Sequence, residues 1–305
     1  RSYAYIQMMH NKYEAYGAHV DDSVNFQVYN KQNQTPETVA AVDETKGQVL
    51  SYKGDIIETY YYSTSYGHTG DYEAWNLDKD AYGYLQGVWV RSEENPIDLS
   101  DEKSFLDYIS NVDSACYESD LKYFRWNTVL DFQGKDETLL HTIADRKEHQ
   151  PEAISYYKDA SKTEKTDSCS NFGSLQAIKV VKRNQSGVIL ELELDFQNGA
   201  VSVQSEYNMR AILGCGITNI NLLDGSSVEM SILPSAYISI QAKGDGTYAV
   251  LGGGYGHGIG MSQNGAQKLC GQGFDYKRIL NYFYQDTELT ELYQPQNMTK
   301  EEGGA

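Results

Sequence analysis

Residues 251–266 read LGGGYGHGIGMSQNGA and form the most informative stretch of the chain. Glycine permits positive φ angles and has no Cβ atom, so backbone amides and His257 can approach a ligand closely before the chain enters a helix near Met261. The spacing lacks the Gly-Lys-Ser/Thr of a phosphate loop and fits the dinucleotide pattern poorly. The stretch therefore predicts either a ligand-facing loop or a crowded strand–helix packing site in which His257 only makes hydrogen bonds.

Strand and helix patterns on both sides of this loop predict an α+β fold. A hairpin is expected around the turn-like Lys-Gly-Asp at 53–55, which separates two strand-like runs. Residues 175–204 predict a β-meander, because Asn-Gly at 198–199 is a strong hairpin signal. Further strands are expected at 235–240 and 247–251, and helices at 1–17, ending on Gly17, and at 276–283, capped by Asp275.

Composition divides the chain further. Residues 99–172 are rich in Asp, Glu, Lys and Ser and predict an acidic, largely helical insertion. The flanking residues, 1–98 and 173–292, are expected to place mixed strands and helices in two lobes around a substrate cleft. Residues 293–305 are polar and are predicted to form a flexible tail.

The chain is strongly acidic, with 43 acidic and 25 basic residues and a formal net charge of −18. This charge repels phosphate backbones and anionic lipids, so we expect binding neither to nucleic acid nor to an anionic membrane. Tyrosine, with 26 copies, suits surfaces that stack on sugars, and it is also a favoured strand residue. The tyrosine content is compatible with both uses.

The cysteines and the chain ends bear on the cellular setting. The four cysteines are too far apart for a zinc knuckle or a redox motif, and they predict either two disulfides or four free thiols: Cys116, Cys169, Cys215 and Cys270. No stretch is long and apolar enough to span a bilayer. The chain lacks an initiator Met and opens inside a helical pattern, so we expect it to be part of a longer protein, with any anchor upstream.

Two C-terminal blocks carry a resemblance to a known family. Residues 254–266 (GYGHGIGMSQNGA) and 273–284 (GFDYKRILNYFY) are similar to the C-terminal signature of the stage II sporulation protein D and amidase-enhancer (SpoIID/LytB) family. Other blocks follow in the family's order: RSYA at 1–4, QVY at 27–29, TKGQVL at 45–50, STSYGHT at 63–69, SG at 186–187 and LPSA at 233–236. The resemblance covers most of residues 1–98 and 173–292 and leaves the acidic segment as this protein's own elaboration.

The resemblance implies a lytic transglycosylase, which cleaves peptidoglycan glycan strands, preferably after their stem peptides have been removed. In this chemistry a single Glu donates a proton to the glycosidic oxygen and then takes one from the muramic acid 6-hydroxyl, which closes a 1,6-anhydro product. The family's Glu lies upstream of the block that matches residues 1–4. The catalytic residue is therefore expected before Arg1, and the fragment by itself is expected to be inactive.

The resemblance also bears on metal binding. Some family members bind zinc through a His and two Cys, and the second Cys stands immediately before the block that matches residues 27–29. Phe26 occupies that place here, and His19 alone cannot complete a four-ligand zinc site. We therefore expect neither a metal nor another cofactor.

The resemblance places nine residues of the Ser-rich block and the Gly-rich loop in the substrate site: Ser63, Thr64, Ser65, His68, His257, Gly258, Met261, Ser262 and Gln263. His257 and the serines are expected to hold sugar hydroxyls, whereas an exposed loop histidine is the ordinary alternative for His68. Trp75 is either a sugar platform or a packed aromatic. Glu73 is expected to be a solvated surface charge.

The expected partners are peptidoglycan glycan strands and other cell-wall hydrolases of the envelope or engulfment machinery. The expected location is extracytoplasmic, in the cell wall or anchored to the membrane through an upstream segment. A second hypothesis is a non-catalytic peptidoglycan-binding module or amidase activator that uses the same cleft without cutting. A third is a purely structural partner in an envelope complex. A Glu in the upstream helical segment favours the enzyme, and its absence favours binding.

Overall fold

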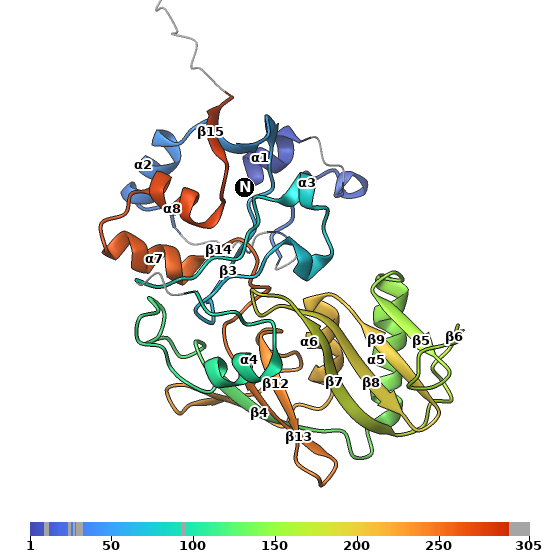
Figure 1. The fold of residues 1–305 in the computed structure, drawn as a ribbon. Helices are drawn as coiled ribbons and strands as arrows, with labels where there is room; N and C mark the ends of the chain where they lie inside the picture. The colour runs from blue at the N-terminus through green and yellow to red at the C-terminus, as the bar shows by residue number, and fades with distance from the viewer. Residues whose placement is uncertain (9–11, 24–25, 27, 29–32, 93–95, 293–305) are drawn as a thin grey trace, which may run out of the picture. The chain divides into compact units, whose positions relative to one another are not determined.

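The structure is a computed structural model that describes residues 1–8, 12–23, 26, 28, 33–92 and 96–292. It confirms the α+β class (Figure 1). Two compact units make up the chain, one formed by Arg1–Tyr60 with Asp286–Ala305 and the other by Tyr61–Gln285. The expected tail at 293–305 and most of the block at 27–29 lie outside the described residues. The substrate cleft stays a prediction.

The first unit is built around an antiparallel sheet with the strand order β15-β1-β2. β1 (Gln48–Tyr52) and β2 (Asp55–Ile56) form the expected hairpin, in which Lys53 and Gly54 have φ angles of 52° and 91°. Two positive φ angles give the turn the twist that a two-residue hairpin needs. β15 (Glu288–Glu291) pairs with the other edge of β1, so both ends of the chain contribute to this sheet.

The helices of the first unit are short. α1 (Ser2–Gln7) ends at Met8, and the 3₁₀-helix η1 (Glu14–Tyr16) ends at Gly17 with a φ angle of 65°. The predicted helix over 1–17 is thus divided, although Gly17 does provide the left-handed end that the sequence predicts. α2 (Pro36–Glu44) begins after Thr35, whose side chain accepts a hydrogen bond from the Thr38 N–H.

The second unit contains two five-stranded sheets, with the strand orders β6-β5-β9-β8-β7 and β11-β10-β4-β13-β12. All neighbouring strands in both sheets are antiparallel. The predicted meander is confirmed as β7, β8 and β9. The strands are β4 (Trp126–Asp131), β5 (Ile154–Tyr157), β6 (Lys165–Thr166), β7 (Leu175–Arg183), β8 (Ile189–Phe196), β9 (Gly199–Val203), β10 (Ile220–Leu222), β11 (Ser227–Val228), β12 (Ile238–Ala242) and β13 (Thr247–Gly252).

Alternation along β8 explains how the first of these sheets is stabilised. Leu192 and Leu194 are fully buried in the core, whereas Glu193 and Asp195, which alternate with them, point to the other face. There the Lys179 ammonium contacts Glu193 at 3.2 Å and also Asp195. The hydrophobic core therefore lies on one face of the sheet, and ion pairs neutralise the acidic face.

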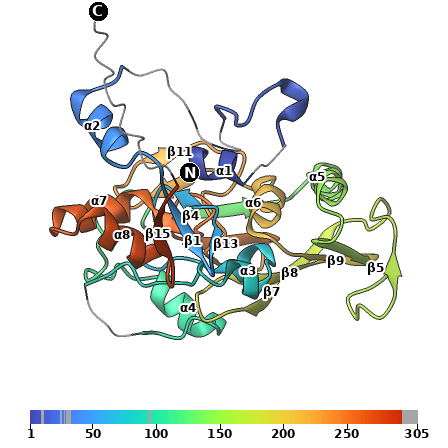
Figure 2. The ribbon, with the colours of Figure 1, turned by 90° about the horizontal axis from the view of Figure 1, so that it is seen from above.

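Two helices cover the core side of this sheet, as Figures 1 and 2 show. α5 (Asp136–His149) contributes Leu139 and Ile143 to the core, and α6 (Glu206–Gly214) contributes Met209 and Ile212. The same cluster continues into the second sheet through residues of β4, β10, β12 and β13. One continuous core thus joins the two sheets of this unit. None of the described helices is long and apolar enough to cross a bilayer.

The segment 99–172 differs from its predicted largely helical character. It contains α4 (Glu102–Ile109) and α5, but it also supplies β4, which lies between β10 and β13, and β5, which lies between β6 and β9. In β4 the buried and more exposed residues alternate, a strand pattern that the surrounding acidic composition obscures. This segment therefore contributes strands to both five-stranded sheets.

The remaining elements carry the predicted site. β3 (Tyr61–Tyr62) pairs in parallel with β14 (Met261–Ser262), and α7 (Gln263–Gly271) follows at once. The predicted helix start near Met261 is thus confirmed. α8 (Tyr276–Phe283) is also confirmed with its cap, because the Asp275 side chain accepts a hydrogen bond from the Arg278 N–H. Two short turns, η2 (Tyr72–Trp75) and α3 (Lys79–Tyr82), lie between β3 and α4.

Candidate functional site

The Ser-rich block and the Gly-rich loop meet along a backbone seam, which we define as residues 61–70 and 254–264. Beyond the pairing of β3 with β14, the Thr64 N–H donates to the Tyr255 carbonyl oxygen at 3.1 Å, and the Tyr255 N–H donates back at 2.8 Å. Further along, the Gly70 N–H donates to the Gly258 carbonyl oxygen at 2.6 Å. The fold thus brings together the two segments that the sequence selects.

Glycines in this seam permit close packing within the protein. A Cβ atom at Gly258 would lie 2.2 Å from the Tyr237 ring, and one at Gly254 would lie 2.8 Å from the Thr64 carbonyl oxygen. Both glycines have positive φ angles, 79° and 82°, which residues with a Cβ atom rarely adopt. At these two positions the structure supports the packing interpretation of the loop.

The His257 imidazole is fixed by two backbone groups of the seam. Its Nδ1 accepts a hydrogen bond from the Ile259 N–H at 3.1 Å, and its Nε2 lies 2.9 Å from the Tyr61 carbonyl oxygen. Because a carbonyl oxygen only accepts, Nε2 carries the proton and the neutral tautomer is defined. The Trp75 ring lies beside the imidazole, with 5.0 Å between the centroids. Both ring nitrogens of the half-buried His257 are thus bound to backbone groups, and its imidazole lies near the rings of Trp75 and Tyr62.

Exposure separates the nine predicted site residues into two groups. Five are buried: Thr64, Ser65, His68, Gly258 and Ser262. Four keep accessible surface, and we call them the exposed set: Ser63, His257, Met261 and Gln263. Only the exposed set can contact a ligand without rearrangement of the second unit.

A buried carboxyl group that the sequence did not indicate occupies the inner side of the seam. Glu118 has no exposed surface, and its Oε1 accepts hydrogen bonds from the Ser65 N–H at 3.1 Å and from Ser262 Oγ at 2.7 Å. Its Oε2 accepts a hydrogen bond from Ser65 Oγ. Ser262 Oγ also caps α7 by accepting from the Gly265 N–H at 3.2 Å. In this structure both serine hydroxyls therefore bind Glu118 and do not face solvent.

Burial dominates the electrostatics of Glu118. It raises the pKa of this carboxyl group from 4.5 to about 7, and the hydrogen bonds from Ser65 and Ser262 oppose that rise only in part. Glu118 stands in Cys-Tyr-Glu-Ser at 116–119, which matches no motif and lies in the segment regarded as an insertion. Only the three-dimensional structure relates it to the seam.

His68 lies inside the second unit, so neither the sugar contact nor the exposed-loop alternative describes its position here. Its imidazole packs edge-on against Trp89 at 4.6 Å, and Nδ1 donates to the Thr69 carbonyl oxygen at 2.6 Å. Burial lowers the pKa of His68 to about 4, although the bond to Thr69 acts in the opposite direction. His68 is therefore neutral near pH 7 and acts as a packing residue.

The η2 turn places Trp75 beside His257. Asp71 caps this turn by accepting a hydrogen bond from the Glu73 N–H at 3.0 Å, and Asn184 donates to the carboxylates of both acids. Trp75 Nε1 donates to Glu206 Oε1 at 3.4 Å. Burial raises the pKa of Asp71, whereas Glu73 is exposed as expected. The indole is held by its nitrogen and keeps part of its surface accessible.

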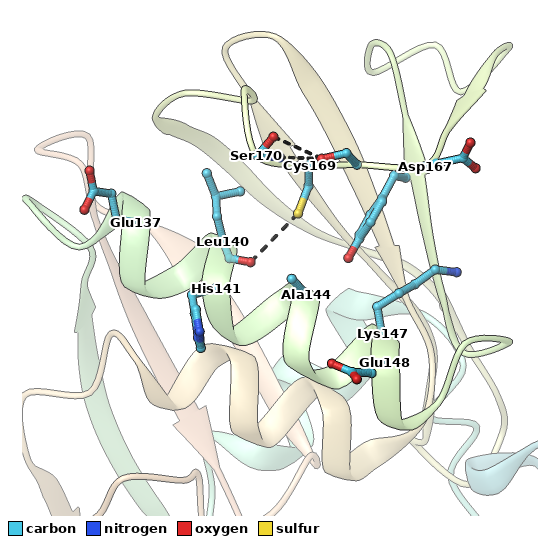
Figure 3. Close-up of a pocket in the computed structure, with 11 residues that line it drawn as sticks. Glu137, Leu140, His141, Ala144, Lys147, Glu148, Asp167, Cys169 and Ser170 are labelled. Atoms are coloured by element: carbon cyan, nitrogen blue, oxygen red, sulfur yellow. Dashed lines mark hydrogen bonds between the residues drawn. The ribbon is translucent and has the colours of Figure 1, made fainter.

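A separate hollow of about 460 Å³ lies beside α5, and none of the nine predicted residues lines it (Figure 3). Cys169 is buried at its inner side, where its thiol donates to the Leu140 carbonyl oxygen at 3.8 Å. Burial raises the pKa of this thiol, which makes it a weak nucleophile. Lys147 Nζ donates to the carbonyl oxygens of Pro151 and Ile154. These groups are therefore occupied by the protein's own backbone.

Aromatic packing surrounds the position at which related proteins are expected to have a zinc-binding cysteine. Phe26 is buried and packs edge-on against Tyr5 and Tyr13, with centroid distances of 4.9 and 6.2 Å. His19 is exposed. Across the described residues, no three or more His, Cys, Asp or Glu side chains gather as a metal site. The absence of a cofactor stays a prediction. All four cysteines are free thiols.

Two protein families match different parts of this chain. Residues 67–260 match the family described as Domain of unknown function (DUF8618), which covers more than half of the chain. Residues 1–52 match the family described as Stage II sporulation protein. The first match runs continuously through the segment 99–172.

Curated relatives align with most of this chain. It is 26% identical over 288 residues to the amidase enhancer of Bacillus subtilis (strain 168), an alignment that covers 90% of this chain and 35% of that protein. It is 23% identical over 288 residues to the stage II sporulation protein D of the same organism, covering 90% and 61%. The corresponding protein of Bacillus amyloliquefaciens is 23% identical over 290 residues, covering 90% and 60%. The chain therefore spans less than two thirds of the length of these relatives.

Proposed function

Because this chain belongs to the SpoIID/LytB family and, through residues 67–260, to the family DUF8618, we propose that it acts on peptidoglycan glycan strands as a lytic transglycosylase. Family membership connects the chain with the cell wall or with sporulation. The glycan substrate, the 1,6-anhydro-muramic product, an extracytoplasmic location and cooperation with other wall hydrolases are parts of the proposal.

The observation that carries the proposal is that Trp75 lies beside His257, which belongs to the exposed set. Sugars are bound by apolar ring faces together with fixed hydrogen-bonding groups. Trp75 and His257 are both held by hydrogen bonds, and their rings lie 5.0 Å apart. Ser63 and Gln263 add a hydroxyl and an amide that keep accessible surface. This arrangement suits a hydroxyl-rich ligand.

The exposed set positions the glycan, and proton transfer requires a carboxyl group from elsewhere. None of its four members is a carboxylic acid. Glu118 has the pKa of a general acid, but it has no exposed surface and its oxygens are bound to Ser65 and Ser262. In this proposal Glu118 is a positioning residue that fixes the seam from inside.

The second candidate function is activation of an amidase without glycan cleavage. It is favoured by the relative named amidase enhancer, which aligns with 90% of this chain. Its prediction is an increase in the turnover of a wall amidase on intact peptidoglycan, with no new glycan ends.

The two candidates are separated by incubating the full-length protein with purified glycan strands stripped of stem peptides and analysing the products by mass spectrometry. We expect 1,6-anhydro-muramic ends. Their absence would rule out the transglycosylase, and stimulation of an amidase in a parallel assay would then support the activator.

The exposed set is tested with two glutamines of α7. Gln263 lies in the exposed set at the start of this helix, and Gln267 is exposed one turn later. We expect Gln263→Ala to weaken glycan binding by about tenfold, the effect of a lost hydrogen bond worth roughly 1 kcal/mol or slightly more, and Gln267→Ala to leave it unchanged. Equal binding by both variants would remove this helix start from the site.

A further inference from the structure

A second cavity of the Tyr61–Gln285 unit has the charge pattern of an anion site. It measures about 850 Å³ and is lined by residues 87–89 and 91–92, by Pro96 and Tyr117, and by Phe274, Gln285 and residues of α8. Arg91 and Arg278 are among these residues, and no described lining residue is an Asp or Glu. Two arginines with no acid among the described lining residues are unexpected in a chain with a formal net charge of −18. The described part of the lining therefore presents two cations to the cavity.

Arg91 at this cavity is buried but incompletely paired. Its side chain is only 4% exposed, and its Nη1 donates to Asp113 Oδ2 at 3.2 Å. Its guanidinium group lies 4.1 Å from the centre of the Trp89 ring. Within the part of the chain that the structure describes, Nε and Nη2 are shielded from water and have no hydrogen-bond partner. Leaving charged donors unpaired costs stability, which a ligand can offset when it binds.

The geometry of the two unpaired nitrogens indicates the kind of ligand. Nε and Nη2 lie on the same edge of a guanidinium group, and together they donate to both oxygens of one planar carboxylate. Arg278 adds a second cation that is exposed and lies 3.5 Å from the centre of the Phe274 ring. Because Asp113 already offsets part of the Arg91 charge and the whole chain is acidic, a monoanion is favoured over a dianionic phosphate.

The walls of the cavity suit a ligand with a sugar or peptide body. Trp89, Tyr117, Phe274 and Tyr282 line it. The Tyr282 hydroxyl donates to the Trp89 carbonyl oxygen, which ties α8 to the segment that carries Arg91. The carboxylate end would then bind Arg91 while the body lies against aromatic rings.

We propose that this cavity binds a carboxylate group of a cell-wall fragment, with Arg91 as the bidentate donor and Arg278 as the cation at the rim. The identity of the ligand rests on the proposed function, whereas the anion site rests on the cavity itself. Two wall components carry such a group, the lactyl carboxylate of muramic acid and the terminal carboxylate of a stem peptide.

The experiment compares matched pairs of ligands by calorimetry on the full-length protein. N-acetylmuramic acid is compared with N-acetylglucosamine, which lacks the lactyl carboxylate, and a D-Ala-D-Ala peptide with a free carboxylate is compared with its C-terminal amide. Inorganic phosphate is the fifth ligand. Tryptophan fluorescence is recorded in parallel, since a ligand reaches the shielded nitrogens only if the cavity wall shifts around Trp89.

We expect one carboxylated ligand to bind at least about tenfold more tightly than its uncharged partner, as a bidentate charge-assisted contact requires. The pair that shows this difference identifies the source of the carboxylate, either muramic acid or the stem peptide. Equal binding within both pairs, or phosphate binding as tight as that of the better carboxylate, would overturn the proposal.

Three variants locate the site. Arg91→Lys keeps the positive charge but loses the two-nitrogen edge. We therefore expect this variant to bind the carboxylated ligand at least about tenfold more weakly than the wild type. Should this variant fail to fold, the exposed Arg278→Gln provides the test, with a smaller loss of about threefold. Lys277→Gln is the matched control, because Lys277 is exposed beside Arg278 and does not line the cavity. Losses of equal size in Arg278→Gln and Lys277→Gln would mean general charge attraction and would refute the assigned site.

Glycan cleavage is measured in a separate assay. Failure of the carboxylate site is therefore distinguishable from failure of the proposed function.

Discussion

Replacing Glu118 with Gln tests the buried carboxyl group behind the seam. The change keeps the shape of the side chain and removes its ability to ionise. A Gln Oε1 can accept the hydrogen bonds from the Ser65 N–H and Ser262 Oγ, and its Nε2 can donate to Ser65 Oγ. We therefore expect Glu118→Gln to fold and to lose the pH dependence of stability that Glu118 imposes.

The sign of this pH dependence follows from the raised pKa. Below pH 4.5, the ordinary value, Glu118 is protonated in both the folded and the unfolded chain and has no effect. As the pH rises to about 7, the unfolded chain releases its proton first, so the free energy of unfolding falls. Across the full window the loss is about 3 kcal/mol, because each tenfold change in proton affinity corresponds to about 1.4 kcal/mol.

The assay is equilibrium unfolding in urea at about pH 5 and about pH 8, where the Glu118 contribution differs by about 2 to 3 kcal/mol. His68 acts in the opposite direction: its pKa is lowered to about 4, so its contribution is present above pH 6.5 and is lost as the pH falls toward 4. In the wild type the two contributions to the free energy of unfolding partly cancel, so its pH dependence alone does not reveal either residue. The informative quantity is the variant's free energy of unfolding minus that of the wild type at each pH.

Glu152→Gln is the control, because Glu152 is exposed. We expect this control to follow the wild type, while Glu118→Gln gains stability relative to the wild type between about pH 5 and about pH 8. A difference that stays constant with pH would mean that Glu118 is already ionised in the folded protein at the lower pH. That result would refute the conclusion that burial outweighs the two serine hydrogen bonds.

Three further outcomes are expected. Gly258→Ala should lower the free energy of unfolding by about 2 kcal/mol or more, since its Cβ atom would meet a buried tyrosine ring at a positive φ angle, whereas Gly271→Ala, with no atom within 4 Å, should stay within about 0.5 kcal/mol. A chelator should leave the melting temperature unchanged, while Phe26→Ala should destabilise the first unit by about 3 to 5 kcal/mol in a urea titration; a chelator-induced drop would instead indicate a structural metal. A thiol reagent should label exposed Cys270 in the folded protein and reach Cys116, whose pKa burial raises to about 11, only after unfolding; labelling of both at equal rates would contradict the structure.

Features set by a few neighbouring residues could be predicted from the sequence. The Lys53–Gly54 turn and the Asp275 cap depend on conformations and side-chain contacts within four residues, and the structure has both. The meander of β7, β8 and β9 follows from alternation and Asn-Gly, again local signals. The β4 strand was missed because its alternation is short and lies in a stretch of helical and acidic character.

Contacts between distant segments could not be predicted in the same way. Glu118 reaches the seam from 53 and 144 residues away in sequence, and no local pattern encodes such a distance. The two segments that the motif resemblance selected do pair with each other in the structure. The resemblance could not show that Ser65 and Ser262 turn inward while Gln263 stays exposed, because that depends on which neighbour occupies each side of the backbone.

The pairing of β1 with β15 has a consequence for biosynthesis. A ribosome releases β1 before residues 61–285 and β15 after them, so the sheet of the first unit cannot be completed until residues 61–285 have been made. Until then, β1 has within its sheet only the two-residue strand β2 as a partner and presents a free edge. Domains generally fold as they emerge, so the Tyr61–Gln285 unit can fold while the first unit waits for β15. Nascent chains stalled before residue 288 should therefore be the ones that most need protection from aggregation.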